Sequence, residues 1–144
     1  MRLFKSFNKY SKNIAIIDKE YSNLTYKKVL IETDKIREKI KKRSLILIVS
    51  ENSLGSLLAY IFCIINNHVG IIVDLKTTKQ NILKIFKEYQ PNYIFISKKN
   101  NSIFKKVCSE KYIFFDQSLM KNKLTKEKKM NKNLSLLLST SGSM

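Results

Sequence analysis

Residues 45–74 read LILIVSENSLGSLLAYIFCIINNHVGIIVD and contain a strand–helix–strand pattern. The opening residues, 45–49, are all apolar and too few for a helix, which is typical of a strand buried on both faces of a parallel sheet. Four polar residues follow, and residues 54–65 are apolar on almost every side, which predicts a helix with neighbours on two sides. Small residues near the start of this helix permit a neighbour to approach closely: Gly55, Ser56 and Ala59. With a second buried strand at 71–73, the segment predicts two parallel strands joined by a right-handed crossover.

Elements of the same kinds are expected on both sides of this segment. Residues 14–18 and 21–24 predict a small hairpin, and Thr25 can cap an amphipathic helix that extends to Ile40. The later expected elements are, in order, a helix that Thr77 or Thr78 caps and that ends before Pro91, a strand at 93–96, a short helix at 102–108, and strands at 112–115 and 134–138. Alternating strands and helices predict an α/β fold, a largely parallel sheet flanked by helices, with residues 1–144 in one domain.

One long segment lacks any apolar periodicity. Residues 120–133 are dominated by lysine and asparagine. Such a composition is typical of a solvated segment that buries little apolar surface. We therefore predict a flexible Lys/Asn-rich loop at about 120–133, before the last strand.

Charge is the strongest signal in the composition. The chain carries 28 basic and 11 acidic residues, a formal net charge of +17, and such an excess is typical of proteins that bind nucleic acid or anionic membranes. Only three of the basic residues are arginines, namely Arg2, Arg37 and Arg43. Arginine is the residue that reads base edges and forks onto phosphate, and the abundant lysine, asparagine and isoleucine share A/T-rich codons. We therefore expect no specific nucleic-acid binding.

The sequence shows no signal for export or membrane insertion. Residues 1–12 contain no apolar block of the kind that secretory signals carry, and the most apolar window, 54–73, is interrupted by polar residues at 66–68. Cys63 and Cys108 lack the spacing of a metal site or a redox motif and fit a reducing compartment. We expect a cytoplasmic protein without a transmembrane segment.

Few residues suggest conventional catalysis. His68 is the only histidine, which argues against a histidine-based metal site or catalytic triad, and its place at a predicted helix end favours a structural role. Asp74 follows a predicted strand, at the edge where open α/β sheets bind ligands, but aspartate is also common there as a turn or cap residue. Glu51 and Asp116 leave the same two alternatives open. Neither cysteine has a recognisable catalytic partner.

The most informative segment is the last one. The strand predicted at 134–138 runs into residues 139–143, which read STSGS. Hydroxyls, a glycine and backbone N–H groups after a buried strand favour a cradle for phosphate, whereas the alternative is an ordinary flexible Ser/Gly tail. The Walker pattern GxxxxGK(S/T) does not occur in the sequence. A buried strand so near the end of a chain is expected to continue into further structure, which favours the cradle.

Three earlier parts of the sequence carry motifs that occur together in one known family. Residues 24–30, LTYKKVL, are similar to an L-T-Y-x-E-L helix start, with the second lysine where an acidic residue is usual. Residues 51–53 and 70–74, ENS and GIIVD, flank the apolar helix as in the block N-S … A-x-L-K-A-G-x-x-x-V-P-L-D, with asparagines and histidine at 66–68 in place of small residues. Residues 89–96, YQPNYIFI, are similar to the strand entry A-x-P-K-x-(V/I)-(I/L).

The last segment completes this set of motifs. Residues 138–143, LSTSGS, are similar to the opening of the phosphate-binding motif (Y/S)-T-S-G-(S/T)-T-G-x-P-K-G. In order and spacing, these segments resemble the adenylate-forming enzymes, the family of acyl-CoA synthetases, peptide-synthetase adenylation domains and luciferases. The resemblance extends from about Ile14 to Ser143.

This resemblance implies an AMP-forming carboxylate ligase. Such enzymes activate a carboxylic acid with ATP and Mg²⁺, release pyrophosphate, and mostly pass the acyl group to a thiol acceptor, either CoA or a carrier protein. The resemblance implies that Thr140, Ser141, Gly142 and Ser143 contact the ATP phosphates, and that the remaining catalytic and metal-binding motifs lie downstream. We therefore expect a truncated N-terminal subdomain of the AMP-binding fold, a quarter to a third of such an enzyme and inactive alone.

Two other functions are compatible with the sequence. One is a non-catalytic basic α/β module that binds anionic polymers or membranes, because residues 98–132 carry 11 basic and 3 acidic residues. The other is one half of a split ligase that a separately encoded C-terminal chain completes. In the fragment, apolar surface around Leu136, Leu137 and Leu138 is expected to be exposed, so we predict marginal stability and a tendency to associate.

Overall fold

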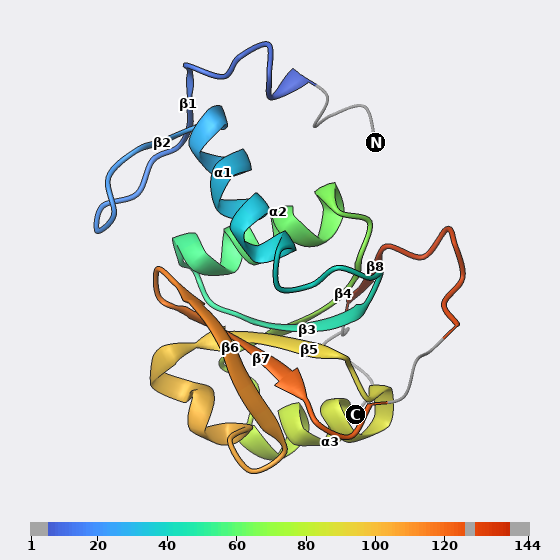
Figure 1. Cartoon of the computed structure of the whole chain (residues 1–144). Coiled ribbons are helices and arrows are strands. Elements are labelled where there is room, and N and C mark those ends of the chain that lie inside the picture. Colours follow the sequence, from blue (N-terminus) through green and yellow to red (C-terminus); the bar gives the residue numbers. More distant parts are fainter. Residues whose placement is uncertain (1–5, 126–128, 139–144) are drawn as a thin grey trace.

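The computed structural model describes residues 6–125 and 129–138, which form a six-stranded sheet, a two-stranded sheet and the helices packed on them (Figure 1). The elements along the chain are β1 (Ile14–Ile16), β2 (Leu24–Thr25), α1 (Tyr26–Arg37), β3 (Leu45–Ser50), α2 (Leu54–Ile65), β4 (Val69–Asp74), α3 (Lys79–Tyr89), β5 (Tyr93–Ser97), the 3-10 helix η2 (Lys98–Ile103), β6 (Cys108–Phe114), β7 (Gln117–Asn122) and β8 (Leu136–Leu138). This order confirms the predicted strand–helix alternation from β2 to β5. None of the described helices has the length and apolar character needed to cross a bilayer.

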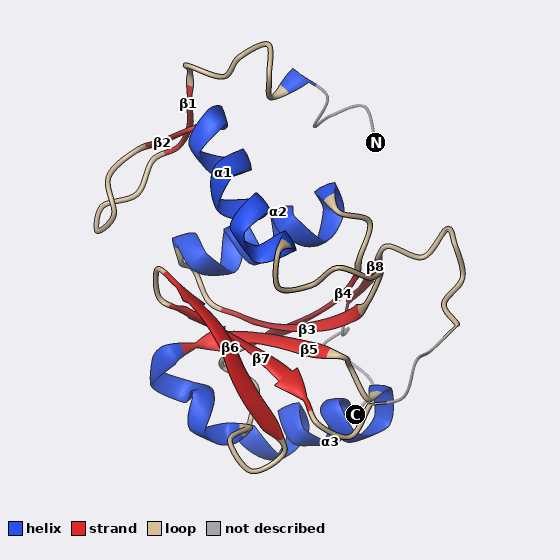
Figure 2. Ribbon diagram, in the orientation of Figure 1, coloured by secondary structure: helices blue, strands red, loops and turns tan. Residues whose placement is uncertain are grey.

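The large sheet is mixed, with the strand order β6-β7-β5-β3-β4-β8 (Figure 2). Its four strands β5, β3, β4 and β8 are parallel, with β3 paired to β4 from Leu45↔Val69 through Ser50↔Asp74. Strands β6 and β7 form an antiparallel hairpin, and β7 is also antiparallel to β5. The prediction of an α/β fold is confirmed, and the largely parallel sheet is corrected to a mixed one. Only residues 115–116 join β6 to β7, and so short a connection cannot make a parallel crossover.

Helices cover both faces of the sheet. Figure 2 shows α1 and α2 on one face and α3 on the other. The side chains of β3 alternate between these layers, because Ile46 and Ile48 pack in the core with Phe62 of α2, whereas Leu47 and Val49 pack with the other core, which includes Phe86 of α3. A strand buried on both faces has no polar side to show, which explains the uninterrupted apolar run at 45–49.

The predicted helix starts are confirmed by side-chain caps. The hydroxyls of Thr25, Ser53 and Thr78 each accept a hydrogen bond from a backbone N–H in the first turn of α1, α2 and α3, respectively. Such a bond satisfies one of the N–H groups that a helix start leaves without a partner. Helix α3 ends before Pro91, where Gln90 takes a left-handed conformation with a φ of 47°.

The short helix predicted at 102–108 is wrong in extent and type. The chain forms the 3-10 helix η2 over Lys98–Ile103 instead, and Cys108 already belongs to β6. Phe104, directly after η2, is fully buried and packs on Phe86 at a ring-centroid distance of 5.1 Å. This tertiary contact anchors the turn.

The loop predicted at about 120–133 is also wrong over its first residues, because β7 extends to Asn122. This strand was not predicted, since four of its six side chains are polar. Three of those, Gln117, Ser118 and Asn122, are buried and hydrogen-bonded to partners from other parts of the chain. Polar residues that the tertiary structure satisfies in this way carry no strand signal in the sequence.

The last predicted strand is confirmed but shorter than expected. It covers Leu136–Leu138, pairs with β4 only, and forms one edge of the large sheet. Leu138 is 66% exposed, whereas Leu136 and Leu137 are half-buried. Apolar surface is therefore exposed at this edge mainly through a single side chain.

Candidate functional site

The parallel strands all start along one boundary of the sheet and all end along the opposite boundary, and each of these two boundaries carries a hollow. We call the edge at the ends of β3 and β4 the carboxyl edge and the edge at their starts the amino edge. Open α/β sheets bind ligands most often at the carboxyl edge, because loops and helix starts converge there. Polar and charged side chains line the hollows at both edges.

At the carboxyl edge, the chain after β3 and the chain after β4 enclose a hollow of about 410 Å³. Its lining contains Ser50, Glu51 and Asn52 from the first strand end and Asp74 and Lys76 from the second. A neighbouring hollow of about 390 Å³ shares the first three of these residues. The carboxyl edge therefore brings polar side chains from two strand ends together, as the sequence predicts for Asp74 and Glu51.

Hydrogen bonds hold these strand ends in place. The backbone N–H of Leu75 donates to the carbonyl oxygen of Ser50 at 2.8 Å, which extends the pairing of β3 and β4 beyond the strands. Asp74 accepts a hydrogen bond from the backbone N–H of Lys76 at 2.7 Å through its Oδ1 atom. Asp74 thus forms the turn after β4, which confirms the turn role as one of its two alternatives, and it also lines the hollow.

Asp116 belongs to a structural network and lies in neither hollow. Its carboxylate accepts hydrogen bonds from the Ser53 hydroxyl at 2.6 Å and from the Gly55 backbone N–H at 3.0 Å, both at the start of α2. A negative charge at a helix start is stabilised by the unpaired N–H groups there. A Cβ atom on Gly55 would lie 2.4 Å from Cγ of Gln117, so the predicted close approach at this glycine is confirmed.

His68 is also structural, as predicted. It is 3% exposed, stacks on Phe62 at a ring-centroid distance of 4.9 Å, and accepts a hydrogen bond from the backbone N–H of Ser44 at Nδ1. Burial, with a smaller contribution from the nearby charge of Arg43, lowers the pKa of His68 to about 4. The imidazole is therefore neutral at pH 7, with its proton on Nε2.

The two cysteines are buried free thiols. Burial raises the pKa of the Cys63 thiol far above its usual range, and burial raises the pKa of Cys108 to about 11 against the opposing effect of Lys123. Protonated thiols are weak nucleophiles, so both are core residues. No group of three or more metal-ligating side chains occurs among residues 6–125 and 129–138.

The residues predicted to bind the ATP phosphates, Thr140, Ser141, Gly142 and Ser143, lie outside the described residues. Leu138 of β8, the last described residue, pairs with Ile72 of β4, two residues before Asp74.

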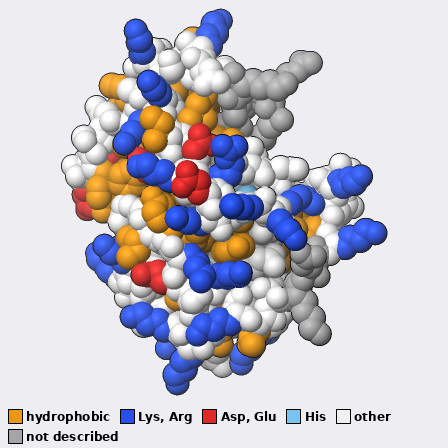
Figure 3. Space-filling model, in the orientation of Figure 1, with side chains coloured by type: hydrophobic (Ala, Val, Ile, Leu, Met, Phe, Trp, Pro, Cys, Tyr) orange, Lys and Arg blue, Asp and Glu red, His pale blue; other side chains and the backbone are white. Residues whose placement is uncertain are grey.

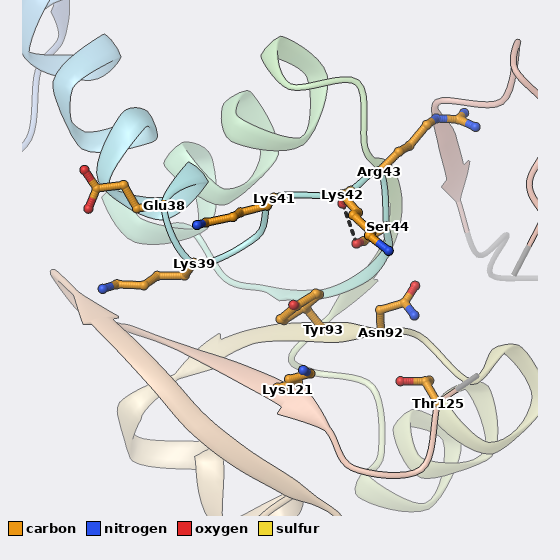
Figure 4. Close-up of a pocket in the computed structure, with 10 residues that line it drawn as sticks. All are labelled: Glu38, Lys39, Lys41, Lys42, Arg43, Ser44, Asn92, Tyr93, Lys121 and Thr125. Atoms are coloured by element: carbon orange, nitrogen blue, oxygen red, sulfur yellow. Dashed lines mark hydrogen bonds between the residues drawn. The ribbon is translucent and has the colours of Figure 1, made fainter. Parts of the chain in front are cut away.

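Sequence reasoning missed a hollow at the amino edge, which we call the basic hollow (Figure 4). It measures about 600 Å³, and its lining carries five basic side chains, those of Lys39, Lys41, Lys42, Arg43 and Lys121, against a single acidic one, that of Glu38. The residues between them include Asn92 and Tyr93 at the start of β5. The four basic residues within 39–43 were a usable signal, but the sequence could not show that Lys121 joins them.

Comparisons with known proteins add no assignment. No protein-family model matches the chain, and a search of curated proteins found no match.

Proposed function

We propose that this chain is the N-terminal part of an AMP-forming carboxylate ligase and is inactive by itself. The proposal rests on the resemblance of its motifs to the adenylate-forming enzymes and on their order along the chain. Within that family the segment would be an N-terminal subdomain of the AMP-binding fold. Its partners would be a carboxylic acid and a thiol acceptor, either CoA or a carrier protein.

The observation that carries the proposal is the place of β8 in the sheet. β8 lies beside β4 and parallel to it, so residues 139–143 follow a strand that ends at the carboxyl edge. Hydroxyls and backbone N–H groups after such a strand are suited to hold phosphate. The hollow that contains Ser50 and Asp74 lies at the same edge. This arrangement supports a phosphate-binding role for Thr140, Ser141, Gly142 and Ser143.

The described side chains at the carboxyl edge fit part of a Mg-ATP site. Asn52 and Lys76 supply amide and ammonium donors that suit phosphate oxygens, whereas Glu51 and Asp74 supply carboxylate oxygens that suit Mg²⁺. The Ser50 hydroxyl already donates to the Val73 carbonyl oxygen at 3.3 Å. When bound, Mg²⁺ offsets the negative charge that develops on departing pyrophosphate. One lysine and two carboxylates do not neutralise a triphosphate, so the residues that complete the site would come from the rest of the enzyme.

A complementing chain is part of this proposal. An AMP-forming ligase needs an acyl pocket and a catalytic lysine, and in the family these follow the phosphate motif. They would be supplied either by the continuation of this chain or by a separate C-terminal chain of a split ligase. A cytoplasmic location accompanies the proposal, because both described cysteines are free thiols.

The coding DNA tests the family assignment directly. Translating the sequence beyond codon 144 in all three frames is expected to give T-G-x-P-K-G soon after Ser143. Unrelated sequence in every frame would reject the ligase assignment.

Enzyme assays test the activity. The chain alone is expected to show no ATP–pyrophosphate exchange with a panel of carboxylic acids, and co-expression with the downstream reading frame is expected to restore exchange. In the restored enzyme Ser141→Ala is expected to lower the exchange rate by at least ten-fold, whereas Ser135→Ala, at an exposed position before β8, is expected to leave it unchanged. Equal rates in the two variants would contradict the role of the phosphate segment.

A further inference from the structure

We infer that the basic hollow at the amino edge is a binding site for a compact anion that carries several phosphate groups. This site lies at the opposite end of the parallel strands from the carboxyl edge and does not depend on the ligase proposal. In this interpretation, the lysines of the hollow form a defined site on the protein. The alternative is a diffuse positive charge that attracts any polyanion.

The first argument is uncompensated charge. Of the ion pairs formed by the described residues, all three lie on α1, where Glu32 binds Lys28 and Lys35 and Asp34 binds Arg37. Lys39, Lys41 and Lys121 take part in none of these pairs, and all three are exposed. The Lys39 ammonium lies over the Tyr112 ring, 5.8 Å from its centroid, and this cation–π contact does not neutralise its charge. Like charges held around one concave surface repel each other, and an anion bound between them relieves that repulsion.

The lysines, and not the arginine, would hold the anion. Arg43 donates hydrogen bonds to the carbonyl oxygens of Asn67 at 3.0 Å, Asn131 at 3.0 Å and Leu134 at 2.6 Å. Figure 4 shows its guanidinium directed away from the other basic side chains, toward the segment that leads into β8. Its donors are therefore used within the protein. An ammonium group binds phosphate as a compact point charge, so lysines alone can supply the attraction.

The second argument is a fixed floor. Asn92 accepts a hydrogen bond from the Leu45 backbone N–H at 3.0 Å through its side chain and donates its own N–H to the Leu45 carbonyl at 2.8 Å. Asn122 donates its backbone N–H to Asn92 at 3.0 Å and its side-chain amide to the Pro91 carbonyl at 3.0 Å. These bonds tie the starts of β3 and β5 to the end of β7. The distance between residues 41–44 and Lys121 is thereby set before any ligand binds, which reduces the entropy cost of binding.

Shape favours a compact ligand over a nucleic acid or a membrane. Figure 3 shows basic side chains spread over this whole face of the molecule, so charge alone does not distinguish the basic hollow. The volume of the basic hollow, about 600 Å³, distinguishes it, because this volume lies within the usual range of small-ligand pockets. A flat bilayer surface does not fill such a hollow; a membrane would enter it only through a headgroup that itself carries several phosphates, which is the same compact ligand chemistry. Single-stranded nucleic acid needs aromatic rings for stacking, and Tyr93 is the one aromatic residue in the described lining.

The test is calorimetric titration of the whole chain with inorganic tripolyphosphate. We expect one binding site per chain. The variant K39Q/K41Q/K121Q is expected to weaken binding by at least ten-fold. The matched control K79Q/K84Q/K87Q removes three exposed lysines from α3, on the other face of the sheet, and is expected to weaken binding by less than two-fold. Unchanged circular dichroism and melting temperature would show that both variants fold.

A single variant separates this inference from the ligase proposal. Lys76→Gln removes the lysine of the carboxyl-edge hollow and is expected to leave tripolyphosphate binding unchanged. Loss of binding in Lys76→Gln but not in K39Q/K41Q/K121Q would overturn the inference and leave the ligase proposal intact. Equal losses in the two triple variants would also overturn it, because binding would then follow net charge.

Two further titrations identify the source of the phosphates. Binding of ATP that is tighter than that of tripolyphosphate, and that K39Q/K41Q/K121Q abolishes, would support the site and assign it to a nucleotide. Equal affinities would support the site with the phosphate chain alone as its ligand. If a single-stranded oligonucleotide binds while tripolyphosphate does not, the inference is overturned in favour of a nucleic-acid surface.

Discussion

The two outer margins of the large sheet are stabilised in different ways. The hairpin margin, made of β6, β7 and residues 115–116, has strands of seven and six residues, and Leu119 and Met120 within it are almost fully buried. The β8 margin is a three-residue strand whose last side chain, Leu138, is 66% exposed. One margin is held by extensive pairing and close packing, the other by few contacts. Strand length and side-chain burial therefore distinguish the firmly held margin from the weakly held one.

Side chains from elsewhere in the chain complete each margin. At the hairpin margin, Asp116 and Gln117 bind the start of α2. At the β8 margin, Arg43 binds the carbonyl groups that precede the strand. A carboxylate at a helix start and a guanidinium on carbonyl groups both make charge-assisted hydrogen bonds, but only at the first do side chains also pack closely on a glycine, Gly55. Substitutions at the hairpin margin are therefore expected to cost more stability than those at the β8 margin.

Among the substitutions that leave the chain able to fold, Gly55→Ala is expected to have the largest effect and to lower the free energy of unfolding by about 3 kcal/mol. The new Cβ atom would lie 2.4 Å from Cγ of Gln117 and 2.5 Å from Oδ1 of Asp116, so the hairpin turn would have to move away from α2. Gly70→Ala at the β8 margin is the matched control, because its Cβ would meet Leu136 at an ordinary 3.5 Å. Its expected change is within about 0.5 kcal/mol. Urea denaturation measures both, and equal losses would contradict the difference in packing.

Lowering the pH is expected to lower the free energy of unfolding through protonation of His68, which feels the charge of Arg43 at the β8 margin. The pKa of His68 is about 4 in the folded chain and 6.5 as its ordinary value, because burial opposes the charged form. Between these pH values the unfolded chain binds more protons, so stability falls as the pH decreases. The expected loss from pH 7 to pH 5 is about 2 kcal/mol, measured by urea denaturation at each pH.

His68→Asn provides the control for this pH dependence. Its side-chain oxygen can accept the Ser44 N–H that His68 accepts at Nδ1, but it does not titrate. The loss of stability between pH 7 and pH 5 is expected to disappear in this variant. A loss that persists in His68→Asn would assign the effect to other groups.

Arg43→Gln is expected to lower the free energy of unfolding by about 1 kcal/mol, because hydrogen bonds to exposed and half-buried carbonyls contribute modestly. Its larger effect should be local. Relative to the unsubstituted chain, hydrogen exchange should accelerate more at the amides of Leu136–Leu138 than at those of β7. Arg37→Gln, which removes an exposed ion pair on α1, is the control and should leave exchange in β8 unchanged. Uniform acceleration throughout the sheet would show that Arg43 does not act on this margin in particular.

Leu138→Lys is expected to change stability least, by no more than about 0.5 kcal/mol, since the side chain is already exposed. A charged residue on an edge strand opposes pairing with another molecule, so self-association measured by sedimentation should decrease. The same substitution at Leu119, which is fully buried at the hairpin margin, is expected to prevent folding. Unchanged association of Leu138→Lys would show that this edge is not the contact surface.

Much of the core could be predicted because local patterns were sufficient there. The apolar runs at β3 and β4 identify buried strands. Thr25, Ser53 and Thr78 cap α1, α2 and α3, respectively. A helix start needs its capping side chain within the same turn, so the signal is contained in a few adjacent residues. The structural role of His68 was predicted for a similar reason, from its position at a helix end.

The hairpin and the basic hollow could not be predicted in this way. β7 is recognisable as a strand only once Gln117 and Asn122 have found their partners on α2 and at Pro91. Asp116 could have faced a ligand or a helix start, and the packing of Gly55 against it selects the helix start. The basic hollow forms because the end of β7 lies beside the start of β5, which brings Lys121 near residues 39–43.

Amino-acid order alone thus indicated the α/β class, the buried strands and the helix caps, because the signal for each element lies within one turn or one strand. Tertiary structure decided the antiparallel hairpin, the role of Asp116 and the collection of lysines at the amino edge. Those features depend on contacts between residues 31 to 63 positions apart, such as Asn122 with Pro91 or Asp116 with Ser53. Contacts of that range exist only after the chain has closed its loops, so no local pattern records them.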